Sequence, residues 1–248
     1  MKNFELISFA TADELVRAVA SAWLDEIVAA NRAGKTHCVA LSGGRIARKF
    51  FAAVRELVTV RNFGDGDTPS LPANVHLFWA DERCVPPDDP ESNFRLAKEL
   101  LFEPLKIGGA QIHRIRGEDS PEAAAKAAST EISKIAPLNE TGQPVLDLIF
   151  LGMGEDGHVA SLFPGESNVL ILDKVIYRAV NNSPKPPSNR VTLGYAVIAA
   201  ARQVWVLVSG VGKEAALRES LFSKGHTPLA RVTQFRTHTN FFSDFPLV

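Results

Sequence analysis

A glycine-rich segment in the middle of the chain carries the residues best suited to acid–base chemistry. It runs from Gly152 to His158 with the sequence GMGEDGH. The unperturbed pKa of histidine lies nearest to neutrality among the side chains, so His158 suits the role of general base. A nearby carboxylate can orient an imidazole and stabilise its protonated form, and Asp156 is the candidate for that role. The glycines favour a tight loop, which predicts a functional place for His158 over a purely structural one.

A second segment, Ser42-Gly43-Gly44, has the composition of an anion-binding turn. Glycines let the backbone approach a ligand, and free N–H groups at a helix start favour an anion. The segment matches neither GxxxxGK[ST] nor GxGxxG, so it predicts neither a nucleoside-triphosphate loop nor a dinucleotide site. The basic residues Arg45, Arg48 and Lys49 follow directly. An ordinary glycine turn beside solvated basic residues is the alternative interpretation.

Two acids and a base, Asp81-Glu82-Arg83, come directly after an apolar run, and Ser92-Asn93 lies shortly beyond them. A carboxylate at this point could hold sugar hydroxyls or water, and Arg83 could pair with an anion. The hydroxyl and amide of Ser92 and Asn93 offer further polar contacts. A charged surface loop with internal salt bridges is the alternative.

Cations also follow two other breaks in the apolar pattern. The proline-rich segment 183–190 carries Lys185 and Arg190, and Lys213 follows Gly210-Val211-Gly212 just before a predicted helix. Glycines and a cation before a helix are compatible with phosphate. The alternative for the first segment is a polyproline-like connector. No cluster of histidine, cysteine or paired carboxylates has metal-ligand spacing, so the sequence predicts no metal site.

Alternating strands and helices must position these residues. Apolar strands are predicted at 37–41, 75–80, 145–151 and 204–208, helices at 12–31 and 46–60 and from 92, 120 and 213, and loops at 62–74, 81–91 and 181–189. This alternation predicts an α/β fold with an open, mostly parallel sheet and helices on both faces. The nearly continuous apolar strands fit strands that are buried on both faces. Ligands bind beyond the carboxyl ends of such strands, so we expect the polar loops to converge on one site.

Composition excludes several classes of protein. The 248 residues carry 27 Lys+Arg against 28 Asp+Glu, a net charge of −1, and no basic stripe, which argues against a nucleic-acid partner. The length allows one α/β domain over residues 1–248. Cys38 and Cys84 form no pairing pattern, which indicates a reducing compartment. Without a signal peptide or an apolar run of roughly 18 residues, we expect a cytoplasmic protein with no membrane partner.

These segments together resemble the 6-phosphogluconolactonase family, the sugar-lactone hydrolases of the pentose phosphate pathway. The matching stretches occur in the family's order, at 41–44, 79–86 with 92–93, 151–164, and 183–187 with 190–193. The resemblance implies a Rossmann-like α/β fold. It also implies hydrolysis of 6-phospho-D-glucono-1,5-lactone to 6-phospho-D-gluconate without a metal or organic cofactor, by a monomer or small homo-oligomer whose partner is the small phosphorylated lactone.

The resemblance also implies roles for individual residues. His158 would activate the water that attacks the lactone carbonyl, and Asp156 would orient His158. The remaining expected contacts are to the substrate or its phosphate: the cations Arg48, Arg190 and Lys213, with Lys185 and Arg83 as helpers, and the loop residues Ser42, Gly43, Gly44, Asp81 and Asn93.

One departure from the family pattern motivates an alternative. After Ser42-Gly43-Gly44 the family commonly continues Ser-Thr-Pro, whereas this chain has Arg45-Ile46-Ala47. A non-catalytic sugar-phosphate-binding protein is therefore a second hypothesis, although the retention of Asp156 and His158 opposes it. A glucosamine-6-phosphate deaminase/isomerase is a third. That family carries a glutamate shortly after the histidine, where this chain has Phe163.

Overall fold

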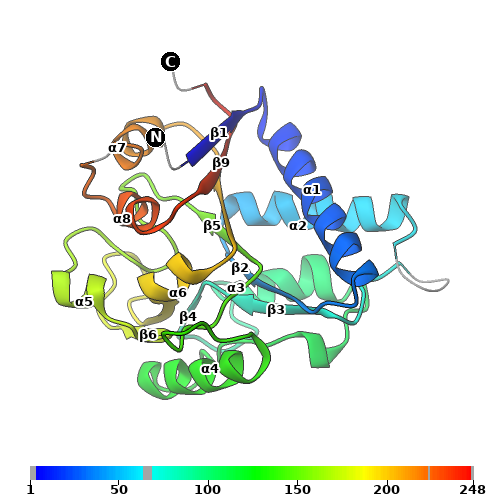
Figure 1. Ribbon diagram of the computed structural model, residues 1–248, viewed down its shortest axis with the longest axis horizontal. Helices are drawn as coiled ribbons and strands as arrows, with labels where there is room; N and C mark the ends of the chain where they lie inside the picture. Colours follow the sequence, from blue (N-terminus) through cyan, green and yellow to red (C-terminus); the bar gives the residue numbers. More distant parts are fainter. Residues whose placement is uncertain (1–3, 64–68, 223, 247–248) are drawn as a thin grey trace.

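The computed structural model describes residues 4–63, 69–222 and 224–246 as two sheets surrounded by helices (Figure 1). The first sheet has six parallel strands in the order β1-β9-β8-β5-β2-β3. The second has three antiparallel strands in the order β4-β7-β6. The strands of the first sheet are β1 (Phe4–Ser8), β2 (His37–Leu41), β3 (Val75–Trp79), β5 (Leu148–Gly152), β8 (Gln203–Val208) and β9 (Thr239–Ser243). Those of the second are β4 (Asp81–Arg83), β6 (Tyr177–Val180) and β7 (Arg190–Leu193).

Helices cover both faces of the parallel sheet. The helices are α1 (Ala12–Arg32), α2 (Arg45–Val60), α3 (Asn93–Ala97), α4 (Pro121–Ile135), α5 (Asn168–Leu172), α6 (Tyr195–Ala200), α7 (Glu214–Ser220) and α8 (Pro228–Phe235). A π-helical turn (Lys98–Phe102) continues α3, and a 3-10 turn spans Gly109–Gln111. Figure 1 shows α1 and α2 on one side of the strands and α6, α7 and α8 on the other. The predicted α/β class with a mostly parallel sheet is confirmed.

The core forms because the central strands bury apolar side chains on both faces, as expected for a parallel sheet. Every residue of β2 is buried. Aromatic rings join the sheet to the helices: Phe150 of β5 lies 5.4 Å from Trp23 of α1 and 4.7 Å from Phe50 of α2 between ring centroids. These contacts hold α2, and with it the loop that precedes it, against the carboxyl end of the sheet.

Three predicted helix starts are confirmed by side-chain caps. The hydroxyl of Thr11 accepts the N–H of Glu14 at 3.1 Å, that of Ser92 accepts the N–H of Arg95, and that of Ser120 accepts the N–H of Ala123. Such caps satisfy backbone donors that a helix leaves unpaired. The cap at Ser92 fixes the start of α3, and the first residue of that helix is Asn93, one of the predicted site residues.

The prediction of a loop over 81–91 is wrong in its first part. Asp81, Glu82 and Arg83 form β4, which pairs antiparallel with β7. The continuous apolar run that marks the strands of the parallel sheet is missing here, and the two acidic side chains are buried and hydrogen-bonded rather than solvated. Ala80 alone separates β3 from β4: its N–H donates to Leu41 in the first sheet and its carbonyl accepts from Leu193 in the second.

Other boundaries also differ from the prediction. The strand expected at 145–151 is β5 and begins at Leu148, because the N–H of Val145 bonds to Pro137 and the Asp147 carboxylate accepts the N–H of Cys38. The predicted loop at 181–189 has no helix or strand. Of the predicted loop at 62–74, residues 64–68 lie outside the described residues. No helix in the described ranges is long and apolar enough to cross a membrane.

Candidate active site

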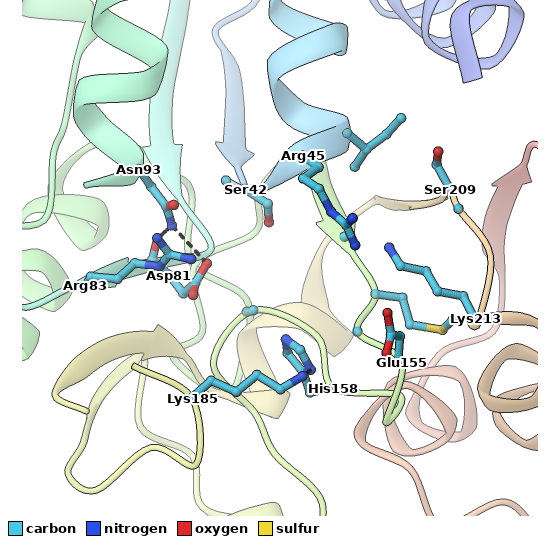
Figure 2. A pocket seen from close by; sticks show the side chains of 18 of the residues that line it. Ser42, Arg45, Asp81, Arg83, Asn93, Glu155, His158, Lys185, Ser209 and Lys213 are labelled. Carbon is cyan, nitrogen blue, oxygen red and sulfur yellow. Dashed lines mark hydrogen bonds between the residues drawn. The ribbon is translucent and has the colours of Figure 1, made fainter. Parts of the chain in front are cut away.

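A cavity of about 370 Å³ lies where the loops after β2, β3, β5 and β8 meet (Figure 2). The segment from Lys185 to Arg190, which leads into β7, closes one side of it. All of the site residues predicted from sequence line this cavity except Asp156, which lies directly behind His158, and Arg48. The expected convergence of loops that are far apart in sequence is therefore what the fold produces.

The imidazole of His158 and the carboxylate of Asp156 form a hydrogen-bonded pair. His158 Nδ1 lies 2.5 Å from Asp156 Oδ1. Because this contact occupies Nδ1, the tautomer it favours carries the proton there and leaves the Nε2 lone pair free. His158 lines the cavity, so Nε2 is the ring nitrogen left to a water or substrate. A pair with this geometry can accept a proton and stabilise the resulting imidazolium.

Two glycines allow this geometry. A Cβ on Gly154 would lie 2.0 Å from the His158 ring, so only glycine lets the imidazole fold back over the loop. Gly157 has φ +74°, a conformation that side chains other than glycine rarely adopt, and a Cβ there would also meet Thr227. The glycine pattern thus has a direct physical reason, which is the close approach of histidine to its own loop.

Burial and neighbouring charges adjust both members of the pair. Burial lowers the pKa of His158, while the hydrogen bond and charge of Asp156 raise it and the charge of Lys185 lowers it. Burial alone would raise the pKa of Asp156, but the hydrogen bonds from His158 and Lys185 outweigh it and leave the value at about 2. The Phe163 ring packs against the imidazole at 5.0 Å between centroids. Burial therefore favours the neutral imidazole, and the hydrogen bonds to Asp156 favour its ionised carboxylate.

Lys185 contacts the same pair from the opposite loop. Its Nζ lies 3.2 Å from Asp156 Oδ2 and 3.2 Å from His158 Nδ1. The backbone of Lys185 is held by Ser183, whose hydroxyl accepts the N–H of Lys185 and donates to its carbonyl. The sequence placed Lys185 with the phosphate contacts, and the structure adds this contact with the histidine–aspartate pair.

A buried polar network lies at the end of the cavity away from Lys213 (Figure 2). Asp81 Oδ2 accepts the Ser161 hydroxyl at 2.6 Å, and the Asn93 amide donates to the Asp81 carbonyl at 3.0 Å. Glu82 holds Asn93 in place, because its carboxylate accepts the N–H groups of Asn93 and Phe94 at 2.8 and 2.7 Å. Burial raises the pKa of Glu82 to about 7, although these N–H bonds lower it. The sequence singled out Glu82 only as a member of the Asp81-Glu82-Arg83 segment, and it did not predict that Ser161 bonds to Asp81.

Most of the hydrogen bonds that Arg190 donates go to backbone carbonyls of its own loop. Its guanidinium donates to the carbonyls of Pro187, Lys185 and Pro186 at 3.0, 3.1 and 3.0 Å. A further N–H reaches the Ser161 hydroxyl at 3.4 Å. Burial lowers the pKa of Arg190 while the charge of Asp81 raises it. Arg190 lines the cavity as predicted, and its geometry is that of an anchor for the loop that carries Lys185.

Of the basic residues at the start of α2, Arg48 is the one predicted to bind phosphate, but it does not line the cavity. Arg45 and Lys49 line it, whereas Arg48 is exposed and does not. Arg45 and Lys49 are four residues apart, about one helical turn, and both side chains reach the cavity. The sequence signal that could have found Arg45 is its position directly after the glycines.

The cavity cations divide into paired and unpaired groups. Lys49 is paired with Asp13 at 2.6 Å, and Arg83 donates to the Glu91 carbonyl at 2.5 Å. Within the described part of the chain, the side chains of Arg45 and Lys213 have no hydrogen bond or ion pair. Burial, followed by the charge of Arg45, lowers the pKa of Lys213. Figure 2 shows both side chains at the same end of the cavity, beside Glu155 and Ser209.

The described residues contain no group of three or more histidine, cysteine, aspartate or glutamate side chains that could hold a metal ion. The polar side chains that line the cavity are cations, together with the His158 imidazole, the carboxylates of Asp81 and Glu155, and the neutral groups of Asn93, Ser42 and Ser209. This donor set suits an anionic ligand that offers hydroxyl groups and an acid–base reaction.

The chain is similar to known proteins over most of its length. The model of the family described as glucosamine-6-phosphate isomerases/6-phosphogluconolactonase matches residues 10–241. The probable chloroplastic 6-phosphogluconolactonase 3 of Oryza sativa subsp. indica is 36% identical over 225 residues, which cover 85% of this chain and 64% of the rice protein. The chain thus spans slightly less than two thirds of that relative's length.

Bacterial and structural relatives match along more of their length. The 6-phosphogluconolactonase of Haemophilus influenzae is 33% identical over 213 residues, which cover 86% of this chain and 84% of that protein. The solved structure of 6-phosphogluconolactonase from Trypanosoma brucei has a TM-score of 0.81 and 26% identity, covering 98% of this chain and 97% of that one. The structural likeness therefore extends over almost the whole length of both chains.

Proposed function

The chain belongs to the glucosamine-6-phosphate isomerase/6-phosphogluconolactonase family, and from this premise we propose that it is a 6-phosphogluconolactonase of the oxidative pentose phosphate pathway. It hydrolyses 6-phospho-D-glucono-1,5-lactone to 6-phospho-D-gluconate. The observation that carries the proposal is the His158–Asp156 pair, 2.5 Å between Nδ1 and Oδ1, at the wall of a cavity lined by cations. Such a pair supplies the base, and the cations suit a phosphorylated substrate.

The proposed reaction begins with a water at His158 Nε2. His158 removes a proton as the water oxygen bonds to the lactone carbonyl carbon, and the carbonyl oxygen takes the negative charge. Collapse of this tetrahedral intermediate breaks the bond between the carbonyl carbon and the ring oxygen. His158 then returns its proton to the ring oxygen, which becomes the product's hydroxyl. Asp156 stabilises the imidazolium between the two proton transfers, and the net change is the addition of one water.

The phosphate of the substrate binds, in this proposal, at the end of the cavity that holds Arg45 and Lys213. Their side chains are the cavity cations without an ion pair or hydrogen bond in the described residues, so an anion there would displace no existing contact. Charge-assisted hydrogen bonds of this kind are the strong ones. Asp81 and Asn93, at the opposite end, then face the hydroxyl-bearing part of the sugar ring.

We also propose that residues 1–248 act as one domain. The single residue Ala80 joins β3 of the parallel sheet to β4 of the second sheet, and loops of both sheets line the same cavity. Neither sheet would form the site alone. A fragment limited to the parallel sheet would lack Asp81, Lys185 and Arg190.

The purified protein should accelerate the disappearance of freshly generated 6-phosphogluconolactone above its spontaneous hydrolysis. The matched control is His76→Gln, which alters a histidine at the edge strand far from the cavity lining. Full activity in a folded His158→Gln variant would overturn the role of His158. Ammonia release from glucosamine-6-phosphate without lactone hydrolysis would favour the deaminase/isomerase. Tight binding of 6-phosphogluconate without hydrolysis would favour a binding protein.

A further inference from the structure

One carboxylate serves two cationic or potentially cationic groups at this site. Asp156 Oδ1 contacts His158 Nδ1 at 2.5 Å, and Asp156 Oδ2 contacts Lys185 Nζ at 3.2 Å. The lysine comes from the loop before β7, which is separate in sequence from the loop that holds the histidine and the aspartate. The Asp156 carboxylate therefore contacts both His158, which must gain a proton during the proposed reaction, and Lys185, which already carries a positive charge.

The donors and acceptors of Lys185 and His158 show how these two groups are held together. A lysine ammonium has only donors, and the Nδ1 of His158 is also a donor when it faces Asp156. Lys185 Nζ and His158 Nδ1 are nevertheless 3.2 Å apart. Two donors cannot bond to each other, so both are held at that separation by the carboxylate they share. Protonation of His158 would place a second positive charge beside the first.

We propose that Lys185 is a positioning residue that, together with the burial of the ring, keeps His158 neutral in the free enzyme by sharing the carboxylate of Asp156. The inference rests on the proposed function, in which His158 is the general base. A carboxylate alone beside an imidazole favours the imidazolium, which cannot accept the proton of water. An ammonium on the other oxygen of that carboxylate offsets this effect. The base is then available at a lower pH than an isolated histidine–aspartate pair would allow.

The surroundings of His158 leave Lys185 as the cation in position to do this. The charged groups acting on the imidazole are Asp156 on its own loop, Lys185 on the facing loop and Asp81 on β4. The Phe163 ring covers one face and carries no charge. Asp81 favours the imidazolium, as Asp156 does, so Lys185 is the member of this set that opposes it.

The fold holds the lysine backbone firmly and leaves its side chain at the cavity. The Lys185 carbonyl accepts from the Arg190 guanidinium and from the Ser183 hydroxyl, and the Lys185 N–H donates to the same hydroxyl. The lysine side chain remains 42% exposed. These bonds suggest a role for the buried Arg190. By donating to backbone carbonyls of this loop, Arg190 fixes the position of the Lys185 ammonium beside Asp156.

The first experiment follows the His158 imidazole directly by NMR with histidine-selective labelling, titrating pH in the absence of substrate. Lys185→Met should raise the pKa of His158, and Lys185→Arg, which retains the charge, should restore it toward the original value. Lys98→Met is the matched control, because Lys98 is a half-exposed lysine paired with Glu103 at 3.5 Å on the π-helical turn after α3. An unchanged pKa in Lys185→Met would overturn the inference.

The second experiment measures kcat/KM across pH. In Lys185→Met the acid limb of the profile should move to higher pH, so that activity falls by roughly three- to tenfold more at pH 5.5 than at pH 8. A lysine that only contacts substrate, or only supports the loop, would lower activity by the same factor at every pH. That uniform loss would contradict the inference.

The two experiments separate this inference from the proposed function. The NMR titration needs no turnover, so it tests the effect of Lys185 on His158 even if the chain does not hydrolyse the lactone. Lactonase activity together with an unshifted imidazole in Lys185→Met would leave the proposed function standing and overturn the role of Lys185. Thermal unfolding of each variant checks that the Met and Arg substitutions leave the fold intact.

Discussion

Gly43 and Asn93 approach so closely that a Cβ on residue 43 would lie 1.8 Å from the Asn93 side-chain oxygen. Gly43 follows β2 and Asn93 opens α3, so this contact joins two of the loops that form the cavity. The Asn93 amide donates to the Asp81 carbonyl at 3.0 Å, which extends the connection to β4. Residue 43 must therefore be glycine so that Asn93 can bond to Asp81, and not only so that the backbone can approach an anion.

Gly43→Ala should therefore displace the Asn93 amide from Asp81. We expect a fall in kcat/KM of about tenfold or more and a loss of about 1–3 kcal/mol in the free energy of unfolding, which is the usual range for an overpacked site. Gly109→Ala is the control, because a Cβ there meets nothing within 4 Å. Lactonase kinetics and urea unfolding of the two variants check the prediction. Equal behaviour of the two would refute it.

Asp156→Asn should lower the pKa of His158 further, because the ammonium of Lys185 would remain beside the imidazole with no carboxylate between them. The amide can also orient the ring in the wrong tautomer, so kcat should fall by about 10²–10⁴-fold, the range for losing general acid–base help. Steady-state kinetics and an NMR titration of His158 measure the two effects. A rise in the pKa of His158 would contradict the electrostatic assignment.

Arg45→Ser restores the residue that the family commonly has after the two glycines. If Arg45 and Lys213 bind the substrate phosphate, this change should raise KM by about tenfold, as expected from losing one hydrogen bond to a charged group. Binding of inorganic phosphate, measured by calorimetry, should weaken in parallel. Arg48→Ser is the matched control, one helical turn away and outside the cavity lining. A larger effect from Arg48→Ser would return the phosphate role to Arg48.

Arg190→Lys tests whether the arginine serves the loop or the phosphate. A lysine keeps the charge but cannot reach the three backbone carbonyls that the guanidinium bonds. We expect a loss of about 2–4 kcal/mol in the free energy of unfolding, together with a lower kcat, because Lys185 would lose its support. Chemical unfolding and kinetics measure both. Normal stability combined with a raised KM alone would show that Arg190 mainly binds phosphate.

A histidine pair formed by His76 of the edge strand β3 and His113, just after the 3-10 turn, predicts how stability depends on pH. His76 Nδ1 lies 2.9 Å from His113 Nε2, and burial lowers the pKa of both rings below the ordinary value of 6.5. Each ring therefore binds fewer protons when folded, so its stabilisation is complete above about pH 6.5 and is lost as pH falls through the folded pKa. His76→Gln should flatten the decline in unfolding free energy between pH 8 and pH 5. The same change at exposed His238 should not.

The sequence predicts the parallel sheet well because its strands are continuous apolar runs that end in glycine or polar residues. It fails at β4, where Asp81 and Glu82 are buried acids whose hydrogen-bond partners lie far along the chain, at Ser161 and Asn93. Arg48 was expected at the phosphate from the family resemblance, whereas the structure brings Arg45 to the cavity and not Arg48. The convergence of the loops could be predicted because the carboxyl ends of parallel strands lie at one edge of the sheet. Which side chains pair with one another could not be predicted in this way.

The single residue between the two sheets has a consequence for motion. Ala80 is hydrogen-bonded through its N–H to Leu41 in one sheet and through its carbonyl to Leu193 in the other, so each of its two peptide planes is fixed to a different sheet. The backbone dihedral angles of this one residue therefore set the angle between the two sheets at the point where they join. In the proposed function, the substrate enters past the side chain of Arg45, which has no hydrogen bond or ion pair in the described residues and can change rotamer far faster than domains close.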